Sequence, residues 1–107
     1  MKHILFLCSQ NKLRSPTAEA VFCDHQGWEV RSAGLDTGAD VLVSTEDIEW
    51  AEYIFVMEQT HKNKLQQKFK TVIKNQHVIC LGILDDYKYM DKELIKILLK
   101  KVPKFID

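Results

Sequence analysis

The sequence has no apolar run long enough to cross a bilayer. Its apolar stretches, such as residues 4–7 and 53–57, are far shorter than the roughly 18 residues that a membrane-spanning helix needs. The first stretch is also too short for the core of a secretory signal peptide, because polar residues follow it at once. We therefore expect a cytoplasmic protein with no membrane partner.

Cysteine is scarce as well, with only Cys8, Cys23 and Cys80 in the chain. Three cysteines cannot all pair with one another, and none stands in a CxxC motif or near a histidine at zinc-ligand spacing. We expect free thiols in a reducing compartment, no metal and no other cofactor. The question becomes whether any of these thiols is reactive.

The chain also lacks net charge, since 15 Lys and Arg balance 15 Asp and Glu. Without a positive field it does not resemble a protein that binds phosphate backbones, so we expect no nucleic-acid partner. The charge is nevertheless divided: residues 1–58 carry four basic and ten acidic side chains, and residues 59–107 carry 11 and five. This division is typical of two solvated faces.

What is present fits an ordinary globular chain: 107 residues, 46% of them apolar and 28% charged. That length is enough for one domain and too short for two, so residues 1–107 are expected to form a single domain. Short apolar runs typical of buried strands alternate with segments of helical periodicity. The strands are predicted at 3–7, 28–33, 53–57 and 78–81, and the helices at 16–26, 46–50, 58–69 and 91–102. This alternation predicts an α/β fold, a three-layer open sheet of four parallel strands with helices on both faces.

Cys8 follows the first predicted strand directly, and open parallel sheets bind ligands at the carboxyl ends of their strands. Five residues separate Cys8 from Arg14, after which Ser15 as N-cap and Pro16 begin a helix. A short loop that returns to a helix N-terminus points backbone N–H groups into one concavity that fits a phosphate-sized anion. We predict that this anion is bound by Ser9, Gln10, Asn11, Lys12, Leu13, Arg14 and Ser15.

The residue types of this loop suit phosphate chemistry. The field that binds the anion also favours a thiolate over a thiol, so Cys8 is expected to be nucleophilic at neutral pH. Arg14 can hold two phosphate oxygens with its planar guanidinium, and Ser15 can donate to the thiolate. The loop contains no glycine, so Asn11 is the candidate for the left-handed conformation that such a loop needs.

A thiolate that attacks a phosphate ester also needs an acid to protonate the leaving oxygen. Asp85 and Asp86 follow the fourth predicted strand, at another carboxyl end of the sheet. Adjacent carboxylates point in different directions, so one of the two can face the site while its neighbour stays solvated.

These segments resemble the low-molecular-weight protein tyrosine phosphatases. The likeness is strongest in CSQNKLRSPTAEAVF at residues 8–22 and recurs in Ser32-Ala33-Gly34, in residues 44–58 and in LDDY at residues 84–87. The resemblance implies the phosphatase-loop fold, with Cys8 as the nucleophile that becomes a phosphocysteine. It also implies Arg14 as the phosphate clamp and Asp85 as the general acid.

The resemblance further implies the supporting residues and the substrate. A hydrogen-bond network of Asn11, Ser15 and Ser32 would shape the loop, and Asp86 and Tyr87 would support the acid. The expected partner is a phosphorylated protein, with phosphotyrosine the first choice, or a small phosphate ester, and inorganic phosphate is the expected product.

The chain also departs from that family. Gln10 replaces a usual glycine, Leu13 replaces a frequent second cysteine, and Asp86 replaces the proline of an Asp-Pro-Tyr motif. The chain is shorter than typical members after Gly34, where the family carries a loop with an aromatic wall. A shallower pocket would lose selectivity for tyrosine before it lost phosphate chemistry.

Three other functions fit the same type of loop. An arsenate reductase needs further thiols, whereas Cys23 and Cys80 are expected to fill the core. A phosphocysteine carrier of a sugar phosphotransferase system is not expected to keep both Arg14 and a proton-shuttling aspartate. A non-catalytic module that binds phosphate or a phosphopeptide is the third alternative. The four histidines, among them His61, are expected to be surface residues or satisfied hydrogen-bond partners.

Overall fold

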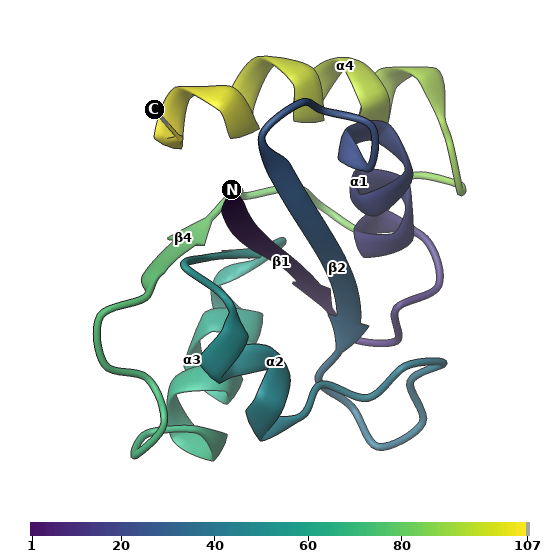
Figure 1. Cartoon of the computed structure of the whole chain (residues 1–107). Coiled ribbons are helices and arrows are strands. Elements are labelled where there is room, and N and C mark those ends of the chain that lie inside the picture. The colour runs from purple at the N-terminus through teal and green to yellow at the C-terminus, as the bar shows by residue number, and fades with distance from the viewer. Residues whose placement is uncertain (107) are drawn as a thin grey trace.

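The described chain folds around one parallel sheet. The structure is a computed structural model that describes residues 1–106. Its strands are β1 (Lys2–Cys8), β2 (Trp28–Gly34), β3 (Tyr53–Val56) and β4 (His77–Cys80). They pair in parallel in the order β2-β1-β3-β4 (Figure 1). The chain adds strands on one side of β1 first and on the other side afterwards. The carboxyl end of β1 therefore lies at this switch point, the usual position of a ligand site in such sheets.

Helices cover both faces of the sheet. Figure 1 shows α1 (Arg14–Phe22) and α4 (Lys92–Lys101) on one side, and α2 (Thr45–Trp50) and α3 (Gln59–Lys68) on the other. A short 3₁₀ helix, Val102–Phe105, follows α4. The predicted α/β fold, an open sheet of four parallel strands with helices on both faces, is confirmed.

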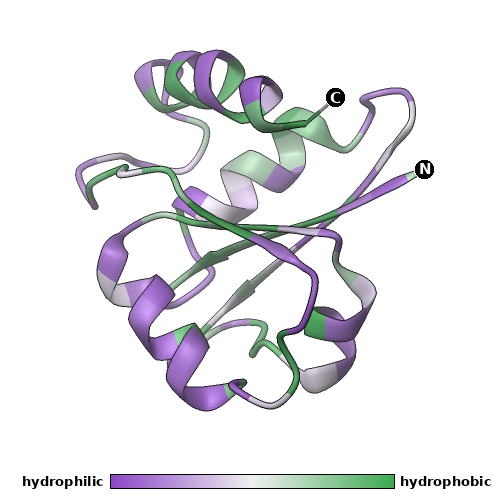
Figure 2. Cartoon of the chain, turned by 90° about the vertical axis from the view of Figure 1, so that its left-hand side faces the viewer, coloured by the Kyte–Doolittle hydropathy of each residue, from purple (hydrophilic) through white to green (hydrophobic). Residues whose placement is uncertain are grey.

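Alternating side chains of β1 supply both cores. Ile4 and Phe6 pack under α1 and α4, whereas Leu5 and Leu7 pack under α2 and α3. All four are fully buried, which explains why β1 is a continuous apolar run rather than an alternating one. In Figure 2 the strands cross the middle of the molecule as mainly hydrophobic ribbons, and hydrophilic residues lie on the outer turns of the helices.

The structure defines the helix ends and corrects one predicted N-cap. A capping box of Ser44 and Asp47 begins α2. Ser15, however, does not cap α1, because the helix begins at Arg14 with Leu13 as its N-cap. Helix α4 ends at Lys101, and Pro103 lies in the 3₁₀ helix that follows it.

The cysteines outside the loop differ from each other in burial. Cys23 is exposed at the end of α1, which corrects its expected place in the core, whereas Cys80 is half-buried under the α2–α3 layer. Within residues 1–106 no group of three His, Cys, Asp or Glu side chains is arranged to hold a metal ion. No helix in that range has the length and apolar character needed to cross a membrane.

Candidate active site

Strand β1 delivers Cys8 to a small pocket at the carboxyl edge of the sheet. The pocket has a volume of about 130 Å³, and Cys8 is only 4% exposed. Its walls combine the turn between β1 and α1 with the segment after β4, two regions that are far apart in the sequence. The lining residues are Cys8, Ser9, Gln10, Lys12, Leu13, Arg14 and Asp85.

The backbone of the loop is oriented by the segment that follows β2. The carbonyls of Cys8, Ser9 and Gln10 each accept a hydrogen bond of 3.0 Å from backbone N–H groups at positions 35, 36 and 40. In a trans peptide the next N–H points the opposite way from the carbonyl, so the N–H groups of residues 9–11 face the pocket. Within residues 1–106 no hydrogen bond engages the backbone N–H groups of residues 9–14. These unpaired donors form a cradle for an anion.

Asn11 gives the loop its sharp turn. It has a φ of 55°, so the predicted left-handed conformation is confirmed. The side chain is 7% exposed, and its Oδ1 accepts a hydrogen bond from the Ser15 hydroxyl over 2.9 Å. Asn11 therefore sets both the backbone path and the position of Ser15.

Ser15 lies between Asn11 and the thiol. Its Oγ is 2.9 Å from Cys8 Sγ and the side chain is fully buried. A hydroxyl has one proton to donate. When Cys8 is a thiol, its S–H donates to Ser15 and the Ser15 hydroxyl donates to Asn11. When Cys8 is a thiolate, the same hydroxyl can turn to the sulfur, so Ser15 is placed to stabilise the thiolate rather than to cap the helix.

Gly34 allows the loop to lie close to the end of β2. A Cβ at this position would lie 2.5 Å from the Cβ of Ala39, 2.7 Å from the carbonyl oxygen of Ser9 and 3.0 Å from the carbonyl carbon of Gln10. No side chain fits at such distances without moving the loop backbone. The Ser-Ala-Gly ending of β2 therefore positions the backbone of the loop after β1.

Arg14 is held in place by acceptors from two other segments. Its Nη1 donates to Glu58 Oε2 over 2.7 Å and to the Ile83 carbonyl over 2.8 Å, and the side chain is 4% exposed. A guanidinium has five N–H donors, so these two bonds leave the other donors for an anion in the pocket. Glu58 follows β3 at the same edge of the sheet, and no local pattern in the sequence links it to Arg14.

The structure distinguishes the two candidate acids. Asp85 lines the pocket, with Oδ1 3.7 Å from Arg14 Nε, and its side chain is 66% exposed. Asp86 is exposed and does not line the pocket, and Tyr87 packs against the core under α1 and α4. Of the predicted pair, only Asp85 therefore lies beside Cys8.

His61 supports the loop from α3, a second contact that the sequence did not predict. Its Nδ1 accepts from the Glu58 N–H over 3.1 Å, so Nε2 carries the proton and donates to Ser9 Oγ over 2.9 Å. Burial and the nearby positive charge of Arg14 lower the pKa of His61 below its ordinary value, and Glu58 only partly opposes them. A neutral His61 fits this pattern of one acceptor and one donor.

Ser32 does not join the loop network and corrects an expectation. Its hydroxyl donates to Glu19 of α1 instead. At the outer wall of the loop, Asp36 accepts two hydrogen bonds. Gln10 Nε2 donates to it over 3.1 Å, and Lys64 donates to the same carboxylate over 2.8 Å. The hydrogen bond from Lys64 is the main reason that the pKa of Asp36 is lowered, and burial opposes it.

No protein-family model and no curated protein matches the sequence. Solved structures do match, and among them is the YwlE arginine phosphatase from Geobacillus stearothermophilus, at 22% identity and a TM-score of 0.77, covering 98% of this chain and 93% of that chain. Wzb from Vibrio vulnificus, in complex with benzylphosphonate, matches at 19% identity and a TM-score of 0.78, with coverage of 97% and 96%.

A third match carries the family description in its name. A low-molecular-weight protein tyrosine phosphatase from T. tengcongensis matches at 22% identity and a TM-score of 0.75, covering 97% of this chain and 99% of that chain. The likeness extends over almost all of each chain. This chain has the fold of the low-molecular-weight protein tyrosine phosphatases.

Proposed function

We propose that residues 1–107 form a single phosphatase-like domain that hydrolyses phosphate monoesters through a phosphocysteine intermediate. The observation that carries the proposal is the pocket itself. The buried thiol of Cys8 lies beneath backbone N–H groups that have no described partner, with Arg14 and Asp85 on the same walls. The structural neighbours that are phosphatases support the same conclusion.

The first step transfers the phosphoryl group to sulfur. The Cys8 thiolate attacks phosphorus, an S–P bond forms, and the P–O bond to the leaving group breaks with its electron pair going to oxygen. Asp85 in its acid form gives that oxygen its proton, so that an alcohol or phenol leaves. The loop N–H groups and the Arg14 guanidinium stabilise the charge on the equatorial oxygens.

The second step hydrolyses the phosphocysteine. The Asp85 carboxylate takes a proton from water as the water oxygen attacks phosphorus. The S–P bond breaks, its electron pair returns to sulfur, and inorganic phosphate leaves. Donation from the Ser15 hydroxyl stabilises the departing thiolate over the 2.9 Å contact.

We infer phosphotyrosine as the preferred substrate. The pocket is only large enough for a small group such as phosphate, and Leu13 at its mouth is 38% exposed. An apolar side chain there can pack on the ring of a phenyl phosphate while the phosphate sits in the cradle. Within residues 1–106 no aromatic side chain lines the pocket, so the ring gains less contact than a deep aromatic slot would give.

Hydrolysis of an aryl phosphate by the wild type and single variants tests the mechanism. We expect turnover that vanadate inhibits, no turnover in Cys8→Ser, and a loss of about 10² to 10⁴-fold in kcat for Asp85→Asn. Asp86→Asn is the matched control and should keep nearly wild-type turnover. Two peptides of otherwise identical sequence, one with phosphotyrosine and one with phosphoarginine, compare the two substrates that the structural neighbours suggest.

The outcomes separate the alternatives. Absence of turnover from pH 5 to 8 together with phosphate binding would leave a non-catalytic phosphate-binding module. Turnover that survives Cys8→Ser would exclude the phosphocysteine intermediate. Arsenate reduction with a thiol donor, or transfer of phosphate from a phosphohistidine carrier to Cys8, would favour the reductase or the carrier instead.

A further inference from the structure

A second hollow lies beside the outer wall of the catalytic pocket. It has a volume of about 370 Å³ and lies between the segment after β2 and helix α3. The first of these contributes Asp36 and Thr37, and the helix contributes Lys64, Gln67 and Lys68. None of these side chains belongs to the lining of the Cys8 pocket.

The wall between the two hollows is the hydrogen-bonded pair of Gln10 and Asp36. Gln10 lines the catalytic pocket and donates to Asp36 Oδ2 over 3.1 Å, while Asp36 Oδ1 accepts from Lys64 over 2.8 Å. The ammonium group of Lys64 is therefore only two hydrogen bonds away from the phosphate cradle. Lys68 is tied to the same region, because its Nζ donates to the Leu35 carbonyl over 2.7 Å.

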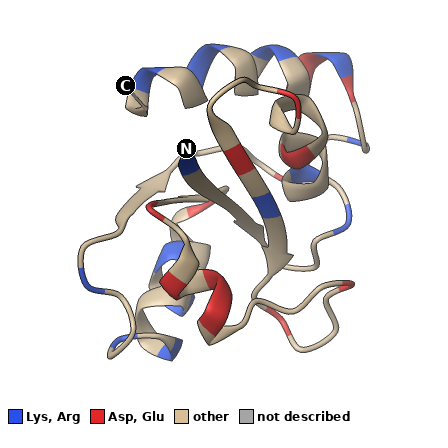
Figure 3. Ribbon diagram, in the orientation of Figure 1, with Lys and Arg blue, Asp and Glu red and all other residues tan. Residues whose placement is uncertain are grey.

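The charge of the second hollow is positive. Asp36 contributes one negative charge, and both of its oxygens already have protein donors. Lys64 and Lys68 contribute two positive charges, and each ammonium has three N–H donors, of which one is used in the described contacts. Figure 3 shows blue segments, the colour of Lys and Arg, along α3. The hollow thus offers spare donors and a net positive charge, a combination that attracts anions and repels cations.

We propose that this hollow is a substrate subsite that binds an anionic group carried next to the scissile phosphate ester. The proposal rests on the proposed function, because the phosphate ester must sit over Cys8 for its neighbour to reach Lys64 and Lys68. Two groups have the required chemistry: the carboxylate of an acidic side chain and a second phosphate. The substrate class is accordingly a phosphopeptide with a further negative charge beside the phosphorylated residue.

Matched peptides with one phosphotyrosine test the subsite. One peptide has glutamates beside the phosphotyrosine, a second has glutamines there, and a third replaces one flanking residue with phosphoserine. We expect kcat/KM for the acidic peptide to exceed that for the glutamine peptide about threefold to tenfold at low salt, mainly through KM. The ratio should shrink as salt is added, because the charges are exposed.

A pair of charge reversals on α3 and the turn that follows it locates the effect. Lys68→Glu changes the hollow from net positive to net negative, so the ratio should fall to one or below. Lys70→Glu makes the same change at an exposed position outside the lining, and the ratio should stay within about twofold of the wild type. Each ratio is taken within one variant, so a general loss of activity cancels.

Binding of the same peptides to Cys8→Ser gives the ratio without turnover, and this separates the two proposals. Failure of the wild type to hydrolyse any aryl phosphate would overturn the proposed function, and the binding ratio would still test the subsite. Hydrolysis with a wild-type ratio of one, or a ratio that Lys68→Glu leaves unchanged, would overturn the subsite alone. The peptide with phosphoserine is compared with the glutamine peptide in the same way. If its ratio exceeds that of the peptide with glutamates, phosphate is the preferred group.

Discussion

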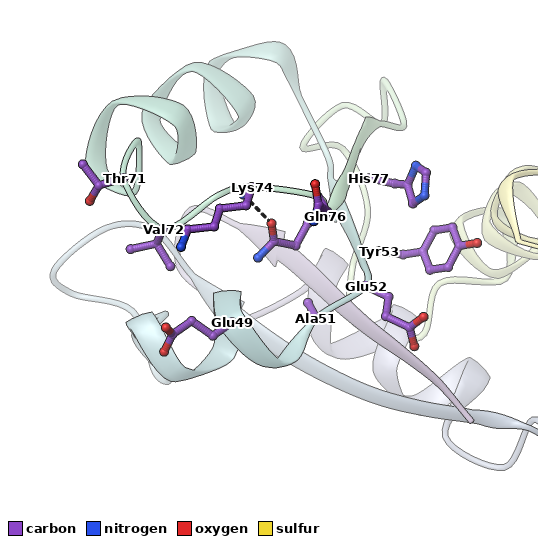
Figure 4. Close-up of a pocket in the computed structure, with 10 residues that line it drawn as sticks. Glu49, Ala51, Glu52, Tyr53, Thr71, Val72, Lys74, Gln76 and His77 are labelled. Atoms are coloured by element: carbon purple, nitrogen blue, oxygen red, sulfur yellow. Dashed lines mark hydrogen bonds between the residues drawn. The ribbon is translucent and has the colours of Figure 1, made fainter.

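The two ends of the sheet each carry a pocket, and the two pockets differ in kind. At the carboxyl end the pocket of Cys8 measures about 130 Å³. At the amino end of β3 and β4 a pocket of about 520 Å³ lies between α2 and the segment before β4 (Figure 4). Its charged and polar side chains point in several directions, and Glu49 and Glu52 point away from each other.

Burial separates the two ends more clearly than volume does. At the carboxyl end Arg14 is 4% exposed and Ser15 is fully buried. Their hydrogen bonds go to residues of the loop or to segments packed against it. At the amino end Glu49, Glu52 and His77 are exposed. Burying a polar side chain costs free energy unless it has hydrogen-bond partners, so buried and hydrogen-bonded polar groups such as Arg14 and Ser15 mark a built site. The smaller pocket is therefore the candidate active site.

Among the substitutions that test the contrast between the two pockets, the largest effect is expected at Arg14. Arg14→Lys should lower kcat/KM by on the order of 10² to 10³-fold, because lysine cannot hold two phosphate oxygens in the fixed geometry of a guanidinium. Turnover of an aryl phosphate measures the loss, and circular dichroism checks that the variant is folded. A loss of less than about tenfold would show that Arg14 does not clamp the phosphate.

The chain offers matched controls for this substitution. Arg31, its other arginine, lies on β2, where it bonds to Asp47 and stacks over Trp50. Arg31→Lys should leave turnover within about twofold of the wild type. Lys74→Gln, in the amino-end pocket, should do the same. If Lys74→Gln lowered turnover as much as Arg14→Lys, the contrast between the two ends would be wrong.

A smaller effect is expected where β2 meets the loop. Gly34→Ala places a Cβ 2.5 Å from Ala39 and 2.7 Å from the Ser9 oxygen, so the loop must move. We expect a loss of about 1–3 kcal/mol in the free energy of unfolding and a clear fall in turnover. Gly38→Ala is the control, because its Cβ would meet only the Gln10 side chain at 3.5 Å. Equal behaviour of the two variants in thermal unfolding and turnover would show that the close approach is unimportant.

The sequence contains most of the fold because periodicity and turn signals are local. Continuous apolar runs predicted the buried strands, and the absence of glycine from the loop identified Asn11, whose φ is 55°. The capping box at Ser44 is equally local. The Ser-Pro pair is typical of a helix start, so Ser15 was predicted as the N-cap. In the structure Ser15 lies inside the first turn, where it makes its buried contact with Cys8.

The contacts that complete the site are long-range, and no local pattern predicts them. Glu58 reaches Arg14 across 44 positions and His61 reaches Ser9 across 52. Each depends on α3 beginning at the same edge of the sheet as α1, which follows from the sheet order and not from the residues near Cys8. The placement of Ser32 against Glu19 is the same kind of result. The resemblance supplied the candidate catalytic residues, whereas the residues that hold them in place are seen only in the structure.

The smallest expected effect concerns the pH dependence of stability. The lowered pKa of His61, caused mainly by burial, keeps the imidazole neutral in the folded protein. The unfolded chain binds a proton at this position below about pH 6.5, so the free energy of unfolding should fall as the pH drops from that value toward the lowered pKa. Above pH 6.5 both states are neutral here, and the residue adds no pH dependence.

His61→Gln should make the fall in stability with acid shallower, by on the order of 1 kcal/mol or less between pH 7 and pH 5.5. Urea unfolding at several pH values measures the slope. The amide of glutamine lies close to the position of Nε2 and can still donate to Ser9, so the substitution removes the titration and keeps this contact. His77→Gln at the amino-end pocket controls for losing an exposed histidine. If His61→Gln kept the wild-type slope, or if His77→Gln changed it by as much, His61 would not be the residue that links the site at the carboxyl end to pH.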